Sequence, residues 1–241
     1  QIITPTEEVM HCFRREAALG KRLSHPHLMP TLAAKTTGDE PYLVMPRIQG
    51  VNLQTILNHQ SAFAISRTIW IARQLTEALA HLHHAGWIHA DMKPENVMIA
   101  ENGHVTLLDL GLAVQVEEAA ADDYGAFHGT PAYAAPELFS STQRLSPASD
   151  VYSLGATVYR LLTGRLPFQG TRPAQLAEAH LCSVPPSART YVPQLPAKLA
   201  RLLDRMMAKN PRRRPTTDGE LQEEWLRFEI ECFALVGAAA A

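Results

Sequence analysis

The pattern of secondary structure expected from the sequence changes at Gly50, and this change limits the folds that the chain can adopt. Before Gly50, a helical pattern at 5–23 is followed by two short strand-forming segments, around 28–34 and 42–45. After Gly50 the pattern is mostly helical, with a long amphipathic segment at 66–84. A small part with strands before a larger helical part predicts an α+β fold of two unequal lobes, with the functional site at their junction.

Turn-forming residues set the expected limits of the remaining elements. Turns are expected at 37–39 and 101–103, with short strands at 97–99 and 105–108 beside the second. Further helices are expected at 53–59, 149–163, 173–182, 197–208 and 217–229. This divides the chain into a partial amino-terminal lobe at 1–48, a complete helical lobe at 49–229 and an apolar stretch at 230–241. That last stretch is read either as a helix end or as the start of a linker.

Composition excludes several classes of function. The formal net charge of −2 provides no overall attraction to nucleic acid or to an anionic membrane. No apolar run approaches the roughly 20 residues that span a bilayer. The three cysteines, Cys12, Cys182 and Cys232, are far apart, which argues against a disulfide framework or zinc site and favours the reducing cytoplasm.

The segment His89-Ala90-Asp91-Met92-Lys93-Pro94-Glu95-Asn96 indicates the chemistry, together with Asp109-Leu110-Gly111, which begins 13 residues after Asn96. Phosphoryl transfer needs a carboxylate to orient the attacking hydroxyl, a cation beside the moving phosphoryl group, and oxygen ligands for magnesium. Asp91, Lys93, Asn96 and Asp109 supply these groups in order. Either motif alone would be read as a solvated loop, but the two at this separation favour phosphoryl transfer.

A third motif, Gly129-Thr130-Pro131-Ala132-Tyr133-Ala134-Ala135-Pro136-Glu137, completes the pattern. With it, the chain resembles the eukaryotic-like protein kinase family, especially its bacterial serine/threonine members, over nearly its whole length. The resemblance implies a two-lobed kinase fold and transfer of the γ-phosphate of ATP, with Mg²⁺, to serine or threonine hydroxyls of a protein. A small-molecule phosphotransferase, the weaker alternative, would not be expected to carry this third motif.

The resemblance also assigns roles to individual residues. Asp91 and Lys93 would be catalytic, Asn96 and Asp109 would hold the metal, and Thr130 would contact the protein substrate. Glu16 would position an ATP-binding lysine, while Met45 as gatekeeper, Ile48 in the hinge and Met98 in the pocket floor would contact the nucleotide. His89, Glu137, Asp150 and Arg214 would be structural, with Asp150 bracing the catalytic loop and Arg214 paired with Glu137.

The chain departs from the family pattern within the activation segment. Ala90 stands where the family has an arginine that binds a phosphate on that segment, and Tyr124 is the only hydroxyl-bearing residue between Gly111 and Gly129. Ordering of this segment by phosphorylation is therefore not expected.

The chain also has no glycine-rich phosphate loop and no strand lysine, and Gln1 lies 15 residues before Glu16, a plausible spacing for that lysine. Two explanations stay open: the sequence is the downstream part of a longer kinase, or it is a pseudokinase that binds partners without catalysis. The 241 residues alone are expected to bind MgATP weakly and to transfer phosphate negligibly.

Two smaller features complete the sequence pattern. Gly20 stands one turn after Glu16, where kinases often have an apolar residue, and is expected to weaken its helix by about 1 kcal/mol relative to alanine. The histidines crowded at 81, 83, 84 and 89 lack a cysteine or carboxylate that would complete a metal site, so we expect the first three to cover a helix end.

Overall fold

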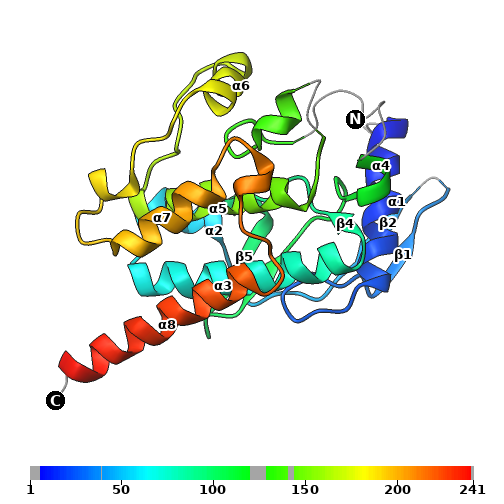
Figure 1. The fold of residues 1–241 in the computed structure, drawn as a ribbon. Helices are drawn as coiled ribbons and strands as arrows, with labels where there is room; N and C mark the ends of the chain where they lie inside the picture. The colour runs from blue at the N-terminus through cyan, green and yellow to red at the C-terminus, as the bar shows by residue number, and fades with distance from the viewer. Residues whose placement is uncertain (1–5, 39, 120–128, 141–143, 240–241) are drawn as a thin grey trace.

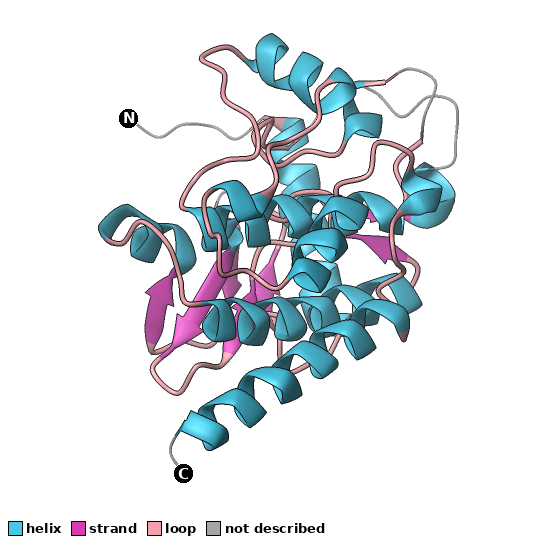
Figure 2. Ribbon diagram, turned by 60° about the vertical axis from the view of Figure 1, so that its left-hand side comes forward, coloured by secondary structure: helices cyan, strands magenta, loops and turns pink. Residues whose placement is uncertain are grey.

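The computed structural model describes residues 6–38, 40–119, 129–140 and 144–239. Gln1, Tyr124 and Asp39 of the expected turn lie outside these ranges. Figure 1 shows helix α1 and strands β1 and β2 at one side of the larger helical part. In Figure 2, most of the strands gather on one side of the molecule, and helices make up the rest. This arrangement confirms the predicted α+β fold with a small strand-containing part and a helix-rich lobe.

The smaller lobe begins with α1 (Glu7–Arg22), whose sequence favours a helix at both ends. The Thr6 hydroxyl accepts a hydrogen bond from Val9 N at 3.3 Å and so caps the first turn. Acidic residues lie in the first turn and basic residues in the last, as the helix dipole favours. The antiparallel pair β1 (Ala33–Lys35) and β2 (Tyr42–Val44) follows.

The expected strand at 28–34 is wrong in its first half. Only residues 33–35 pair with β2, and Leu28 instead forms a single parallel bridge with Leu107 of the larger lobe. Met29 N donates to Leu107 O at 2.9 Å, and Pro30 has no N–H with which to continue a ladder. This segment therefore fastens the smaller lobe to the larger one.

Gly20 has a packing role that the sequence alone does not reveal. A Cβ at this position would lie 2.3 Å from Thr31 Oγ1, and Thr31 N donates to Gly20 O at 2.8 Å. Only glycine lets the segment after α1 approach the helix this closely.

The larger lobe contains seven helices, two small sheets and short 3₁₀ turns within its described residues. Its helices are α2 (Leu53–His59), α3 (Ile65–His84), α4 (Val116–Ala119), α5 (Pro147–Thr163), α6 (Pro173–Cys182), α7 (Ala197–Met206) and α8 (Glu220–Ala239). Its strands are β3 (Gly50–Asn52), β4 (Trp87–Ile88), β5 (Val97–Ala100), β6 (Val105–Leu107) and β7 (Val114–Gln115). The sheets run β3-β5-β6 and β4-β7, and every neighbouring pair is antiparallel.

The core forms around α3 and α5. The predicted apolar face of α3 is buried, with Leu75, Leu79 and Leu82 fully enclosed. Helix α5 is buried on nearly all sides, and its polar residues Ser149 and Asp150 have hydrogen-bond partners in the interior. Helix α8 packs along α3, as Figure 1 shows, and buries Trp225.

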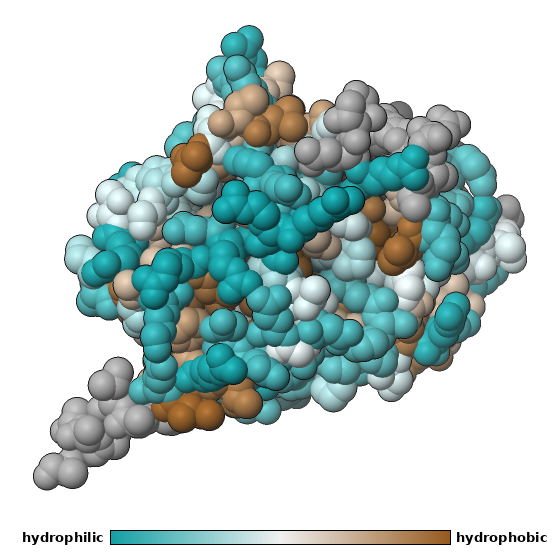
Figure 3. All heavy atoms as spheres, viewed as in Figure 1, coloured by the Kyte–Doolittle hydropathy of each residue, from teal (hydrophilic) through white to brown (hydrophobic). Residues whose placement is uncertain are grey.

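Helix α8 continues well beyond the expected end at 229. The chain stays helical to Ala239. Hydrophilic side chains predominate on the face in Figure 3, with an apolar patch beside the grey end of the chain. In the described part of α8 the exposed large apolar residues are Leu226 and Ile230. Among the described helices, none is both long and apolar enough to cross a membrane.

Candidate active site

Asp150, at the start of α5, fixes the backbone of the loop that carries Asp91. The Asp150 carboxylate accepts hydrogen bonds from His89 N at 2.7 Å and Ala90 N at 2.9 Å. Ala90 has a φ of 66°, a conformation unfavourable for a residue with a side chain, and these bonds hold it there. Burial alone would raise the pKa of Asp150. The hydrogen bond from His83 and the electrostatic effect of His83 and His89 outweigh burial and hold this pKa below its usual value.

His89 connects the same loop to the strand that leads to Asp109. Asp91 N donates to His89 Nδ1 at 3.3 Å, so Nδ1 is the acceptor nitrogen. The Nε2–H then donates to Leu108 O, 3.2 Å away. His89 is fully buried and packs beneath the loop. His89 therefore fixes the loop that carries Asp91 relative to Leu108, the residue before Asp109.

Asp91 lies at the centre of a compact polar cluster. Lys93 Nζ is 2.6 Å from Asp91 Oδ2, and the Thr130 hydroxyl donates to Asp91 Oδ1 at 3.0 Å. Lys93 Nζ also donates to Thr130 Oγ1 at 2.6 Å. Asn96 Nδ2 donates to the backbone oxygen of Asp91 at 2.9 Å and to its carboxylate at 3.1 Å. The structure thus places a cation and a hydroxyl against the carboxylate expected to orient the substrate.

Asn96 and Asp109 have the chemistry required to hold a magnesium ion. Both hydrogen bonds from the Asn96 side chain use Nδ2, and no described residue donates to its Oδ1. Asp109 has a φ of 60°, and its Oδ1 accepts from Gly111 N at 3.0 Å. Leu108 N donates to Asn96 O at 2.8 Å, which joins the two backbone segments. An amide oxygen and a carboxylate are oxygen ligands of the kind that Mg²⁺ prefers.

Glu16 faces this site from α1. Burial, and then the charge of Asp109, raise the pKa of Glu16 to about 7. A Cβ at Gly111 would lie 3.4 Å from Cys12 Cβ, so α1 packs directly against the Asp109-Leu110-Gly111 turn. Within the described part of the chain, no lysine or arginine forms an ion pair with Glu16.

This pKa shift predicts a pH-dependent stability. The folded-state pKa lies above the ordinary value of 4.5, so the folded chain holds the proton more tightly than the unfolded chain. Stability should therefore fall as the pH rises from about 4.5 through about 7. Glu16→Gln should be more stable than the wild type at about pH 8 and nearly equal to it at about pH 4.5 in thermal unfolding of the 241-residue chain. An equal difference at both pH values would contradict this account.

The three apolar residues assigned to nucleotide contact, Met45, Ile48 and Met98, are half-buried. Ile48 lines a cavity of about 500 Å³ together with Gly50, Val51 and Ile99. Neither Met45 nor Met98 lines that cavity. Met98 lies in β5 opposite Asn52 and Thr106. Their contact with adenine therefore remains a prediction.

Arg214 and Glu137 form the buried ion pair expected from the sequence. Arg214 Nη1 and Nη2 lie 2.6 and 2.8 Å from the two Glu137 carboxylate oxygens, and both side chains are 0% exposed. Ser149 donates to Glu137 Oε1 at 2.6 Å, and Arg214 also donates to the backbone oxygens of Ala148 and Ala208. Nearly every polar atom of the pair therefore has a partner, as a buried pair requires.

Sequence reasoning missed the support that surrounds these residues. His83 bridges Asp150 Oδ2 at 2.8 Å and Thr217 Oγ1 at 2.7 Å, so it supports the loop rather than covering a helix end. Lys209 Nζ lies 4.5 Å from the ring centre of Phe168, and burial lowers its pKa to about 8. His83 had a signal in its position in the last turn of α3, but Lys209 had none.

Comparison with known proteins now places the chain in a family. The protein kinase domain family matches residues 3–226, and this chain belongs to it. The chain is 32% identical over 218 residues to the probable serine/threonine-protein kinase pknA2 of Bifidobacterium longum. It is 34% identical over 205 residues to the serine/threonine-protein kinase PknL, and 35% identical over 208 residues to PknE, both of Mycobacterium tuberculosis.

These alignments cover 90%, 85% and 86% of this chain, respectively. They cover only 29%, 51% and 36% of the three relatives. The chain therefore spans only about a third to a half of the length of these relatives. The family resemblance read from the sequence motifs is confirmed.

Proposed function

We propose that this chain transfers the γ-phosphoryl group of ATP to serine or threonine hydroxyls of a protein. The observation that carries the proposal is the contact of Asp91 with Lys93, Thr130 and Asn96 within hydrogen-bonding distance. Membership of the kinase family and similarity to serine/threonine kinases support the same conclusion.

Each residue of the cluster has a separate role in this proposal. Asp91 accepts a hydrogen bond from the substrate hydroxyl and aims its oxygen at the phosphorus atom. Lys93 neutralises charge that develops on the transferred phosphoryl group, and Thr130 holds both side chains beside the substrate. Magnesium held by Asn96 and Asp109 would neutralise charge on the ATP phosphates when bound.

The conditions of the reaction are also part of the proposal. All three cysteines are free, which supports a protein that acts in the reducing cytoplasm; they are Cys12, Cys182 and Cys232. The net charge of −2 gives no reason to propose nucleic acid as a partner. A protein with an accessible serine or threonine is the proposed substrate.

A pseudokinase is the alternative function, and it would need no lysine opposite Glu16. In the described residues Glu16 lacks a cationic partner, and its raised pKa is what an unpaired, buried carboxyl shows. A pseudokinase would use the same fold to bind a protein without transferring phosphate. A phosphate-transfer assay on the intact protein separates the two functions.

Replacing Asp109 tests the nucleotide site. Asp109→Ala removes the carboxylate assigned to magnesium, and we expect the magnesium-dependent part of ATP binding to be lost. Isothermal titration with ATP, with and without Mg²⁺, measures this directly on the intact protein. The control is Asp218→Ala, which removes an exposed carboxylate that is paired with His84. It should leave ATP binding unchanged. Equal magnesium dependence in Asp109→Ala and the wild type would refute the assignment.

A further inference from the structure

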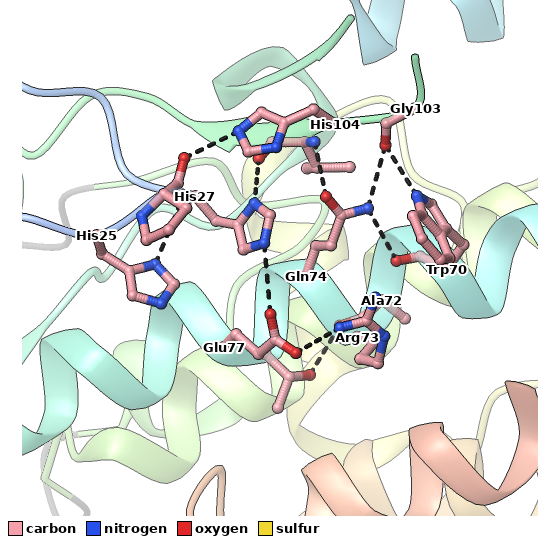
Figure 4. A network of polar contacts seen from close by, with 12 residues as sticks. His25, His27, Trp70, Ala72, Arg73, Gln74, Glu77, Gly103 and His104 are labelled. Carbon is pink, nitrogen blue, oxygen red and sulfur yellow. Dashed lines mark hydrogen bonds and ion pairs between the residues drawn. The ribbon is translucent and has the colours of Figure 1, made fainter.

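Four histidines from three segments form a continuous cluster at the junction of the two lobes. His25 and His27 follow α1, His81 lies in α3, and His104 lies between β5 and β6. The His25 ring is stacked on His81 with 5.1 Å between ring centres, and lies 5.5 Å from His27. The His27 and His104 ring centres are 4.7 Å apart. Figure 4 shows His25, His27 and His104 side by side above α3.

These rings hold the segment after α1 through its polar atoms. His27 Nδ1 lies 2.8 Å from Val105 O and therefore carries its proton there. His104 Nε2 makes the corresponding bond to Pro26 O at 2.9 Å, and His25 Nδ1 accepts from His27 N at 3.2 Å. The cluster thus depends on a specific set of neutral tautomers. The backbone bond from Leu107 N to His27 O, at 2.9 Å, lies in the same place.

We propose that this cluster is a proton-sensitive clamp, which fastens the segment after α1 to the larger lobe at neutral pH and releases it on acidification. Protonation of the stacked His25 and His81 would place two positive charges in ring contact. Protonation of His25 would also remove the acceptor for His27 N. Because Thr31 is bonded to Gly20 in α1, release of this segment would loosen the position of the helix that carries Glu16.

The charges around the cluster decide the direction of the effect. Glu77 Oε2 lies 3.4 Å from His27 Nε2 and by itself would favour a protonated His27. However, Glu77 is already paired with Arg73 at 2.5 Å, and Arg73 is paired with Glu229 of α8 at 2.9 Å. Glu77 is therefore a weak counter-ion for additional imidazolium charge. Among the described residues, Glu77 and Glu229 are the carboxylates that form ion pairs with His27 or Arg73, so protonation of several rings would leave an excess of positive charge.

The expected titration agrees with this geometry. Burial, followed by the neighbouring His81 and His27, lowers the pKa of His25 despite the opposing effect of Glu77. Burial is also the largest influence on His27, whose pKa is lowered although the bond to Val105 and the charge of Glu77 oppose the change. Groups that resist protonation when folded stabilise the fold above their unfolded pKa. That stabilisation is lost as the pH falls below about 6.5.

Amide hydrogen exchange followed by NMR tests the clamp without using catalysis. The amides of Met29 and Leu107 report on the junction, and the amide of Leu154 in the buried helix α5 reports on the rest of the fold. After correction for intrinsic exchange, protection of the first two should fall about tenfold or more from about pH 7.5 to about pH 5.5. Protection of Leu154 should stay nearly constant.

His81→Phe keeps a ring for His25 to stack on and removes one titrating group, so the loss of protection on acidification should shrink. His59→Gln removes an exposed histidine elsewhere and should behave as the wild type. Equal acid sensitivity in His81→Phe and the wild type, or an equal loss at Leu154, would overturn the proposal. If His81→Phe does not fold, the imidazole resonances of His25 and His27 in the wild type decide: titration of both rings at or above about pH 6.5 would refute the proposal. The clamp itself does not depend on the proposed kinase function. Only the functional meaning of a shift of Glu16 rests on that proposal.

Discussion

Asp91→Asn is expected to lower the rate of phosphoryl transfer by about 100-fold or more, with little change in stability or ATP affinity. Asparagine keeps the size and one oxygen of the side chain, but it has no negative charge with which to accept the substrate proton and to balance Lys93. Asp91 is surrounded by Lys93, Thr130 and Asn96, which should hold the substituted side chain in place.

The measurement combines the initial rate of transfer from ATP to a protein substrate with ATP titration and thermal unfolding of the same preparation. Glu101→Gln, which neutralises an exposed carboxylate in the turn between β5 and β6, is the matched control and should retain the wild-type rate. A residual rate above about a tenth of the wild type in Asp91→Asn would show that another group orients the hydroxyl.

The second large effect concerns stability. Arg214→Ala is expected to lower the free energy of unfolding by about 3–5 kcal/mol, because it leaves the Glu137 carboxylate buried without its counter-charge. Both side chains are fully buried, and Arg214 also satisfies the backbone oxygens of Ala208 and Ala148. Urea unfolding monitored by circular dichroism measures the loss.

Two further variants identify the cause of that loss. Arg205→Ala removes the same side chain from the half-exposed pair with Glu220 and should cost at most about 1 kcal/mol. Arg214→Met combined with Glu137→Gln removes both charges, and should be more stable than Arg214→Ala because no isolated charge is left. A double variant as unstable as Arg214→Ala would show that packing, not the stranded charge, dominates.

The sequence predicted those parts of the molecule in which a local pattern has one physical solution. Apolar residues repeating at intervals of three and four predicted the buried face of α3, and paired motifs identified the residues that meet around Asp91. The Arg214–Glu137 pair was also predictable, because two opposite charges in family motifs each needed a partner. In these cases the information lies within a short segment or in a familiar combination of segments.

The remaining features depend on contacts between distant segments. Gly20 looked unfavourable for a helix until its contact with Thr31 showed that no side chain fits there. Leu28 looked like part of a strand, but its partner is Leu107. His25 and His104, the outermost histidines of the cluster, are 79 residues apart in the chain. No local pattern predicts that their rings belong to one cluster.

The proposed kinase activity can be measured by incubating the intact protein with radiolabelled ATP, Mg²⁺ and a generic protein substrate, followed by phosphoamino acid analysis. We expect label on serine and threonine, none on tyrosine, and loss of the label in Asp91→Asn. Absence of any label with the wild-type protein, under conditions in which ATP binding is demonstrated, would contradict the kinase assignment and favour the pseudokinase.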